Sequence, residues 1–491
     1  MKKSNVVMFV ADQMRCDSLH HMGNQASITP NLDQLAEEGI SFSNAYCQNP
    51  VCVPSRCSFL SGLYPHTTGH RTMHYLQREY ENNIFKEMKQ QGYEVIWIGR
   101  NDLLMPGLSK QEYCDEFYNG VDDMIHMEDI EKYHYPKAEY TTPEFMKECS
   151  PYSFYHGITN EEQAKSTFDW NCVDSALAYL ERRNAKSEKP FFLYISVLFP
   201  HPPYECEEPW YSSIDRGQLP QRRKNIDLLH KPEMLNQIFE KQNLKNWDET
   251  RFDELRATYL AMVSRFDHQA GMIMKKLKEL QIYEDTNIFV FSDHGDYTGD
   301  YGMVEKVQNC FEDPICKVPL IIKPSSTWTG HRGICNEVVE LLDLPATLAD
   351  IAGFSLSYTQ FGESLMKCFS NEKRSKTMAI CEGGRIHGEI QAMELGHGKE
   401  SPYWPRLSTQ EKEGGEHTKA IMARIGSYKY VLRLYEDDEC YDLTKDPNEY
   451  HNLIHEEAYS ELICQMRYQL LCRLFETSDV VPIEEDRRIN W

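Results

Sequence analysis

Four apolar runs repeat one pattern along the first 300 or so residues of this chain. Each run is short, rich in Val, Ile and Phe, and followed directly by polar residues; the runs cover residues 6–10, 93–99, 191–198 and 286–291. Such a run indicates a strand that is buried on both faces, and helix-like segments separate the four. Strands that alternate with helices favour a largely parallel sheet with helices on both faces. This α/β pattern continues to about residue 370 and is the strongest constraint on the fold.

The polar residues that follow these runs are expected to meet at one edge of the sheet. The carboxyl ends of parallel strands share an edge, and open α/β sheets bind their ligands there. Oxygen ligands suit a divalent cation, and imidazole can join them. For each residue taken alone, a turn-capping Asp or a loop histidine without chemistry is the alternative. The residues concerned are Asp12, Gln13, Arg100, Asp102, His201, Asp293 and His294, with Lys306 on a later loop.

The stretch Cys52-Val53-Pro54-Ser55-Arg56 is predicted to be a loop that enters a helix. Proline suits a first helical turn, where its missing N–H is not needed. Cys52 would lie at the helix N-terminus, where free N–H groups favour negative charge, and Arg56 would return to the same face. A thiol, a guanidinium and a helix N-terminus together describe a site for a tetrahedral oxyanion. A buried cysteine beside a surface salt bridge is the alternative.

The composition limits the partners and the compartment. The formal net charge of −24 argues against nucleic acid and anionic membranes, and it means that an anionic substrate needs a locally positive pocket. The sixteen cysteines include no Cys-x-x-Cys pair, which argues against a zinc ribbon or a disulfide framework and fits a reducing compartment. The first apolar run is shorter than a signal-peptide core, and no later run could span a bilayer. We therefore expect a cytoplasmic protein.

The chain is expected to hold two domains, because 491 residues exceed a single hydrophobic core. Residues 1–372 would form the α/β catalytic domain. Residues 373–491 contain short strand-like runs and a closing amphipathic helix, which predicts a smaller α+β domain with an antiparallel sheet. Residues 105–165 lack periodicity and read as an irregular insertion that forms a pocket wall. Residues 393–418 form a polar loop that is expected to overhang the site.

Several motifs together resemble the sulfatase family, within the alkaline-phosphatase superfamily. The resemblance covers nearly the whole chain, is weakest over residues 105–165 and 205–250, and implies an alkaline-phosphatase-like fold. His201 and Lys306 fall where the family has an active-site histidine and lysine. The other matching motifs are the sulfatase signature at residues 52–56 and 60–62, the metal-ligand pairs Asp12-Gln13 and Asp293-His294, and a C-terminal signature at residues 441–453.

The resemblance implies a mechanism. In that family the cysteine, here Cys52, is converted to Cα-formylglycine by a separate maturation enzyme. One hydroxyl of the aldehyde hydrate, held on the metal, attacks the sulfur of a sulfate ester, and deprotonation of the other then expels sulfate. The implied ligands of the divalent cation are residue 52, Asp12, Gln13, Asp293 and His294. Ca²⁺ is the favoured ion, and Mg²⁺ or Mn²⁺ also fits these donors.

The resemblance also assigns roles to the cations and histidines around residue 52. Arg56, Lys306 and Arg100 would stabilise charge on the sulfuryl oxygens. His201 would protonate the leaving oxygen. The expected substrate-binding residues are Arg100, His201, Lys306 and His74.

Two departures from the family pattern stand beside the site. Family members commonly have Gly-Lys-Trp-His where this chain has Gly99-Arg100-Asn101-Asp102. Arg100 would replace a sulfate-binding lysine, and Asp102 would replace a histidine that acts as the base in the second step. Asp102 then either takes that role or contacts the substrate. Related hydrolases often have an Asn near position 73, where this chain has Met73 and His74, so that role has no assigned residue.

The expected function is hydrolysis of a sulfate ester, with a small sulfated saccharide or an aryl sulfate as substrate. A formylglycine-dependent phosphonate monoester or phosphodiester hydrolase is the first alternative, because it uses a similar metal site. A non-catalytic sulfate-binding protein is the remote alternative. A homo-oligomer is compatible with the sequence and is left open.

Overall fold

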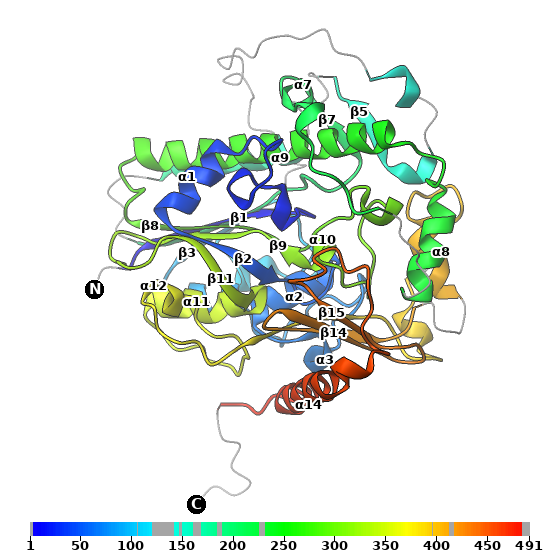
Figure 1. Cartoon of the computed structure of the whole chain (residues 1–491). Coiled ribbons are helices and arrows are strands. Elements are labelled where there is room, and N and C mark those ends of the chain that lie inside the picture. The colour runs from blue at the N-terminus through cyan, green and yellow to red at the C-terminus, as the bar shows by residue number, and fades with distance from the viewer. Residues whose placement is uncertain are drawn as a thin grey trace, which may run out of the picture.

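The computed structural model describes residues 3–105, 107–119, 142–146, 150–160, 168–183, 189–224, 231–394, 396–411 and 417–483. A large sheet with helices on both faces forms most of these residues, and a smaller sheet lies beside it near the C-terminal helix (Figure 1). The fold class predicted from the sequence, α/β with a second, antiparallel sheet, is confirmed.

The large sheet contains nine strands of the described residues, in the order β11-β2-β10-β8-β1-β6-β3-β4, with β9 paired to β2. Neighbours from β8 to β4 run parallel, as do β11 and β2, whereas β10 and β9 are antiparallel to their neighbours. The strands are β1 (Asn5–Ala11), β2 (Ile40–Tyr46), β3 (Glu94–Gly99), β4 (Glu116–Tyr118), β6 (Phe191–Ser196), β8 (Thr286–Ser292), β9 (Lys317–Val318), β10 (Leu320–Lys323) and β11 (Gly333–Glu340).

Helices bury both faces of this sheet. Side chains alternate along a strand, so Val7 of β1 packs on one face and Val6 on the other. The first face is covered by α1 (Pro30–Glu38), α6 (Phe168–Arg182) and α9 (Glu249–Glu279). The second is covered by α2 (Cys52–Ser61), α4 (Ile84–Gln90) and α11 (Leu344–Ala352). In Figure 1, α1 and α9 lie above the sheet, and α2 and α11 lie below it.

The smaller sheet comes from the last quarter of the chain. Its strands are antiparallel in the order β12-β13-β14-β15. The C-terminal helix α14 packs on it through Ile463, Met466 and Leu470. The bounds are β12 (Met378–Gly383), β13 (Ala420–Ile425), β14 (Tyr428–Arg433), β15 (Glu439–Asp442) and α14 (Ser460–Glu476).

Some elements differ from the expectations. Strand β11 was not expected, because its exposed Asn and Glu residues break the apolar pattern. A small parallel sheet pairs β5 (Tyr155–Ile158), which lies inside the expected irregular insertion at residues 105–165, with β7 (Tyr204–Cys206). The remaining helices are α3 (Pro65–Thr68), α7 (Trp210–Ser213), α8 (Glu233–Gln242), α10 (Asp313–Cys316), α12 (Met366–Phe369) and α13 (Trp404–Leu407).

Much of the expected insertion at residues 105–165 lies outside the described residues, including residues 120–141. The pocket wall expected there therefore stays a prediction. Within the described ranges, none of the helices combines the length and the apolar character that a membrane crossing requires.

Candidate active site

Helix α2 begins at Cys52, as the sequence predicts. Val51 is extended at the N-cap, Pro54 lies in the first turn, and Gly62 ends the helix with a left-handed φ of 75°. All ten residues of the helix are buried, and Cys52 is only 1% exposed. The first N–H groups of the helix therefore lie in the interior of the molecule, at the carboxyl edge of the large sheet.

Four potential metal ligands converge at this helix N-terminus. Asp12 follows β1, and Asp293 and His294 follow β8, so two adjacent parallel strands bring them beside Cys52. The ligand atoms of these four buried residues all lie within 4.8 Å of one another. The Sγ atom of Cys52 is 3.5 Å from Asp12 Oδ1 and 3.3 Å from His294 Nε2. Two carboxylates, an imidazole and residue 52 form a donor set that fits a divalent cation.

The imidazole of His294 is held in the form that a metal requires. Its Nδ1 lies 3.0 Å from the carbonyl oxygen of Gly295, so Nδ1–H donates there and the Nε2 lone pair faces Asp12 and Asp293. Burial, together with the charge of Lys306, lowers the pKa of His294 and favours the neutral ring. A backbone acceptor of this kind orients many metal-ligating histidines.

Arg56 lies behind the two carboxylates. Its Nε donates to Asp293 Oδ2 at 3.0 Å, its Nη2 donates to Asp12 Oδ2 at 3.1 Å, and its Nη1 donates to Ser196 Oγ. The side chain is 1% exposed. Arg56 therefore fixes the carboxylates opposite Cys52, and the contact with sulfuryl oxygens that the resemblance implies stays a prediction.

Arg100 and Asp102 form a more accessible corner of the same cluster. Arg100 Nη1 donates to Asp12 Oδ2 at 3.1 Å, and Arg100 Nε lies 3.0 Å from Asp102 Oδ2. The Arg100 side chain is 26% exposed, against 1% for Arg56. The guanidinium of Arg100 therefore keeps donors available for an anion, with a carboxylate beside it.

Lys306 and His201 form a hydrogen-bonded pair. Lys306 Nζ lies 2.8 Å from His201 Nε2, and His201 Nδ1 lies 2.6 Å from the carbonyl oxygen of Pro202. Nδ1–H therefore donates to Pro202, and Nε2 accepts from the ammonium group. Burial and the charge of Lys306 lower the pKa of His201 well below its ordinary value. The proton of this pair consequently lies on Lys306.

Gln13 connects the cluster to a second layer of residues. Its backbone has a φ of 73°, which is uncommon for a residue with a side chain, and its N–H donates to Asp293 Oδ1 at 3.1 Å. The side-chain oxygen accepts from Lys306 at 2.7 Å, and the side-chain amide donates to Asp296 Oδ2 at 2.6 Å. A direct bond from Gln13 to a metal stays a prediction.

Burial and charge set the ionisation states at the centre of the cluster. Burial and the adjacent Asp12 raise the pKa of the Cys52 thiol well above its usual range. Burial opposes ionisation of Asp12 as well, but the charges of Arg100, Arg56 and Lys306 hold its pKa far below the ordinary value. The encoded residue is thus a protonated thiol among carboxylates and three cations.

His74 was expected to bind the substrate, and this role stays a prediction. It is exposed, its backbone N–H donates to Thr72 Oγ1 at 3.2 Å, and the described residues show no contact from its side chain to the four ligands. Met73 is held by a bond from its N–H to Glu394. Neither residue acquires an assigned role.

Arg406 was not predicted from the sequence to lie near the site. Its Nε lies 3.8 Å from Glu305 Oε2, and Glu305 Oε1 lies 3.1 Å from Lys306 Nζ. Arg406 is 7% exposed, and its Nε and Nη1 have no hydrogen-bond partner within the described residues. Arg406 is therefore a buried guanidinium that is connected to Lys306 through Glu305. The only feature of the sequence that could have indicated Arg406 is its place as a single arginine in the aromatic and proline-rich segment 402–406.

A comparison with protein families shows which family this chain belongs to. The family model for Sulfatase matches residues 4–354, which include β1, helix α2, β8 and the four clustered ligands. The chain belongs to the sulfatase family. Sulfatases are metal-dependent sulfuric ester hydrolases, so this chain is an enzyme of that class, and the buried donor cluster agrees with the metal requirement.

Relatives and solved structures match nearly the whole length of this chain. The arylsulfatase of Clostridium perfringens is 28% identical over 505 residues, which cover 96% of this chain and 94% of that protein. The multifunctional alkaline phosphatase superfamily protein PehA of Trinickia caryophylli is 26% identical, with 94% and 93% covered. The crystal structure of the phosphonate monoester hydrolase of Agrobacterium radiobacter superposes with a TM-score of 0.73 at 20% identity, with 98% and 97% covered, which shows a shared fold.

Proposed function

We propose that this sulfatase hydrolyses its substrate with a formylglycine at position 52. The observation that carries the proposal is the state of Cys52, which lies among Asp12, Asp293 and His294 at a helix N-terminus yet is encoded as a thiol with a strongly raised pKa. A protonated, buried thiol is a poor nucleophile. A hydrated aldehyde at the same position would offer two hydroxyl groups to the same ligands.

The maturation step needs a partner enzyme. The Cβ carbon of Cys52 would lose two electrons to the oxidant of that enzyme, the sulfur would leave as hydrogen sulfide, and water would supply the aldehyde oxygen. A second water molecule then adds to the aldehyde and forms the hydrate. The neighbouring Cys57, also buried in α2, is not expected to react and offers an internal control.

The catalytic cycle then divides into two steps. In the first, one hydroxyl of the hydrate attacks sulfur, and the bond from sulfur to the alcohol oxygen breaks. In the second, the other hydroxyl loses its proton, the carbonyl re-forms, and the bond from residue 52 to sulfate breaks. Addition of water to the aldehyde restores the hydrate, so the net reaction converts an ester and water to an alcohol and sulfate.

The side chains around residue 52 have distinct tasks in this proposal. Arg100 and Lys306 bind the sulfuryl oxygens, because both are cationic and Arg100 is partly exposed. The hydrogen-bonded Lys306–His201 pair delivers a proton to the leaving oxygen, with the proton held initially on Lys306. Asp102, beside Arg100, is the proposed base for the second step. A divalent cation at Asp12, Asp293 and His294, with Ca²⁺ favoured, would acidify the hydroxyl of residue 52 and neutralise sulfate charge.

The proposed substrate is a small sulfated saccharide or an aryl sulfate. The arylsulfatase relative and the structural neighbour described as a 2-O GAG sulfatase support these two classes. Arg406 adds a reason to favour a substrate that carries a second anionic group, since its free donors lie close to Lys306 through Glu305.

A phosphonate monoester or phosphodiester hydrolase is the second candidate. Two phosphonate monoester hydrolase structures share the fold with TM-scores of 0.73, and PehA is described as multifunctional. Gln13 in the first metal-ligand pair and the stretch Gly99-Arg100-Asn101-Asp102, which departs from the family's Gly-Lys-Trp-His, are compatible with this alternative. Sulfate and phosphonate esters both place charged oxygens around a tetrahedral centre, so one cluster could process either.

Mass spectrometry tests the modification directly. The chain is co-expressed with a formylglycine-generating enzyme, and the peptide that contains both Cys52 and Cys57 is analysed. We expect an aldehyde at position 52 and a thiol at position 57. Cys52→Ala should abolish turnover, whereas Cys57→Ser should retain it. A fully active enzyme with an unmodified thiol at position 52 would refute the mechanism.

Initial rates test the substrate class. We expect a higher kcat/KM for an aryl sulfate than for the matched aryl phosphonate monoester. The reverse order would favour the second candidate, and no turnover of either ester by fully modified enzyme would favour a binding protein.

A further inference from the structure

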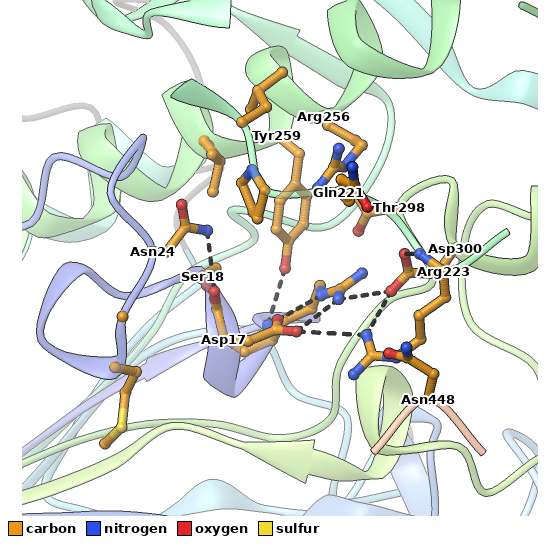
Figure 2. A pocket seen from close by; sticks show the side chains of 16 residues that line it. Asp17, Ser18, Asn24, Gln221, Arg223, Arg256, Tyr259, Thr298, Asp300 and Asn448 are labelled. Carbon is orange, nitrogen blue, oxygen red and sulfur yellow. Dashed lines mark hydrogen bonds and ion pairs between the residues drawn. The ribbon is translucent and has the colours of Figure 1, made fainter. Parts of the chain in front are cut away.

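A second polar cavity lies beside the loops that carry the metal ligands. It has a volume of about 240 Å³, and its walls come from residues 15–24, residues 219–223, helix α9 and the loop after β8. Figure 2 shows Arg223, Arg256, Tyr259 and Asp300 around it. None of the four clustered ligands belongs to its lining. The cavity is therefore separate from the candidate active site.

The two carboxylates of the cavity, Asp17 and Asp300, already accept hydrogen bonds from arginines of the lining. Arg15 donates to both carboxylate oxygens of Asp17, to Asp300 Oδ2, and to the carbonyl oxygens of residues 296 and 297. Asp300 also accepts from the N–H and the Nη1 of Arg223, each at 2.7 Å. The two carboxylates in the lining are thus committed to existing hydrogen bonds.

The other two arginines keep most of their donors free. Arg223 Nη1 donates to Asp300 and lies 3.6 Å from Asp17 Oδ2, and its Nε is buried with no hydrogen-bond partner in the described residues. Arg256 makes one long hydrogen bond, 3.3 Å from its Nη1 to Asp253 Oδ1, although its side chain is only 12% exposed. Burial and the charge of Arg15 lower the pKa of Arg256. Arg223 and Arg256 therefore line the cavity with guanidinium groups whose bonds to Asp300 and Asp253 leave further N–H donors.

We propose that this cavity is an anion site in which Arg223 and Arg256 bind the oxygens of a tetrahedral oxyanion. The lining holds three arginines and two carboxylates, in a chain with a net charge of −24, and Asp253 pairs with Arg256 from outside the lining. Free guanidinium donors bind sulfate and phosphate oxygens with directional, charge-assisted hydrogen bonds. The ligand is either the free ion or the anionic end of a phosphorylated or sulfated metabolite. The proposal does not depend on the chemistry at residue 52.

Tyr259 and Arg15 separate the proposed anion site from the loops that carry Gln13 and the metal ligands. Tyr259, which lines the cavity, donates its hydroxyl to the carbonyl oxygen of Gln13 at 2.9 Å and accepts from the N–H of Arg15 at the same distance. Arg15 also donates to the carbonyl oxygen of Asp296, whose side chain holds Gln13. An anion at this site would therefore lie close to the active site without occupying it.

Thermal unfolding in a Lys306→Ala background tests the proposal, because that substitution weakens anion binding at the active site, where Arg100 remains. Inorganic phosphate and glucose 6-phosphate are titrated at constant ionic strength against chloride. We expect a saturable rise in the midpoint, since a ligand that binds the folded state stabilises it. Adding Arg256→Gln or Arg223→Gln should weaken the apparent affinity roughly tenfold or more. Arg256→Lys should keep part of the rise.

Arg222→Gln is the matched control, because Arg222 pairs with Glu249 and does not line the cavity. It should leave the phosphate-dependent rise unchanged. Each variant is compared with its own midpoint without phosphate, which separates ligand binding from a loss of stability. A stronger effect of glucose 6-phosphate would identify a metabolite as the ligand, and an equal or weaker effect would identify the free ion. The absence of any rise, or a rise that survives both arginine substitutions, would overturn the proposal.

Discussion

At the scale of single residues, the cations around Cys52 differ in what they contact. Arg56 is fully engaged with Asp12, Asp293 and Ser196 and is 1% exposed. Lys306 is bound to His201, and Arg100 keeps donors near solvent. We infer that Arg56 positions the carboxylates, whereas Lys306 and Arg100 are available to a substrate.

Replacement of Asp102 by Asn tests the proposed base. Asp102 Oδ2 is buried and lies 3.0 Å from Arg100 Nε, an ion pair that does not have the geometry of a hydrogen bond. Loss of a general base typically costs about 10²–10⁴-fold in rate. We expect Asp102→Asn to lower kcat by at least about tenfold with a substrate that has a good leaving group, because the second step then limits turnover. Pre-steady-state kinetics should show a burst of the released alcohol.

Arg100→Lys is the matched comparison for Asp102→Asn, because it keeps the positive charge but loses the guanidinium group that pairs with Asp102. We expect that change to act mainly on KM. An Asp102→Asn enzyme with unchanged kcat and no burst would exclude both the base role and a substrate contact for Asp102.

At the scale of elements, the end of β3 depends on a close approach between two strands. Gly99 has a φ of 97° and pairs with Ser196 of β6, and a Cβ atom on Gly99 would lie 1.9 Å from the Ser196 carbonyl oxygen. The hydroxyl of Ser196 accepts from Arg56, and Arg100 follows Gly99 directly. Gly99 therefore allows the chain to deliver Arg100 to the active-site edge.

Alanine substitution at two glycines separates backbone strain from this clash. Gly92 precedes β3 with a φ of 82° and has no atom within 4 Å of an added Cβ. We expect Gly92→Ala to cost about 1–2 kcal/mol from the left-handed backbone alone. Gly99→Ala should cost about 1–3 kcal/mol more and reduce activity, because β3 and β6 must move apart. Equal unfolding free energies in denaturant for the two variants would contradict this account.

At the scale of the whole molecule, the smaller sheet braces the segment that follows Lys306. Lys429 of β14 donates to the carbonyl oxygen of Phe311 at 2.8 Å, to Asp313 at 2.7 Å and to Glu449. Asn309 donates its side-chain amide to the carbonyl oxygen of Thr418, which precedes β13. The two sheets are therefore connected through buried contacts close to the active site.

Lys429→Met is expected to destabilise the protein by about 3–5 kcal/mol, because it leaves buried carboxylates without their cation. The side chain of Lys429 is 1% exposed. Lys445→Met is the matched control, since Lys445 pairs with Asp442 at 70% exposure, where solvent screens the pair, and its loss should leave the stability nearly unchanged. Denaturant unfolding monitored by tryptophan fluorescence measures both. Similar losses in the two variants would argue against the brace.

Acid should weaken the fold through His417. Burial is the main cause that lowers the pKa of His417 to about 4, from 6.5 in an unfolded chain. Below pH 6.5 the unfolded state binds more protons than the folded state, so this contribution to stability falls as the pH decreases toward 4. We expect wild type to lose about 2 kcal/mol more than His417→Gln between pH 8 and pH 5. His74→Gln, at an exposed histidine, should behave like wild type.

The sequence by itself determined the long buried strands, the fold class and the residue types at the active-site edge. Apolar runs such as residues 286–291 must be buried, and the polar residues after parallel strands must meet at one edge, so Asp293 and Asp12 could be placed together without a structure. The edge strand β11 escaped the prediction because its half-exposed residues break the apolar pattern.

Only the tertiary structure decided which atoms touch. The bond from Lys306 to His201 joins residues 105 positions apart, and the free donors of Arg406 and Arg256 depend on segments that pack around them. Hydrogen bonds and buried charges are set by side-chain packing within a few ångströms, whereas sequence patterns report only burial and periodicity. For that reason, the motifs predicted a cluster around Cys52, and the fold decided that Arg56 supports it while a second, arginine-lined cavity lies beside it.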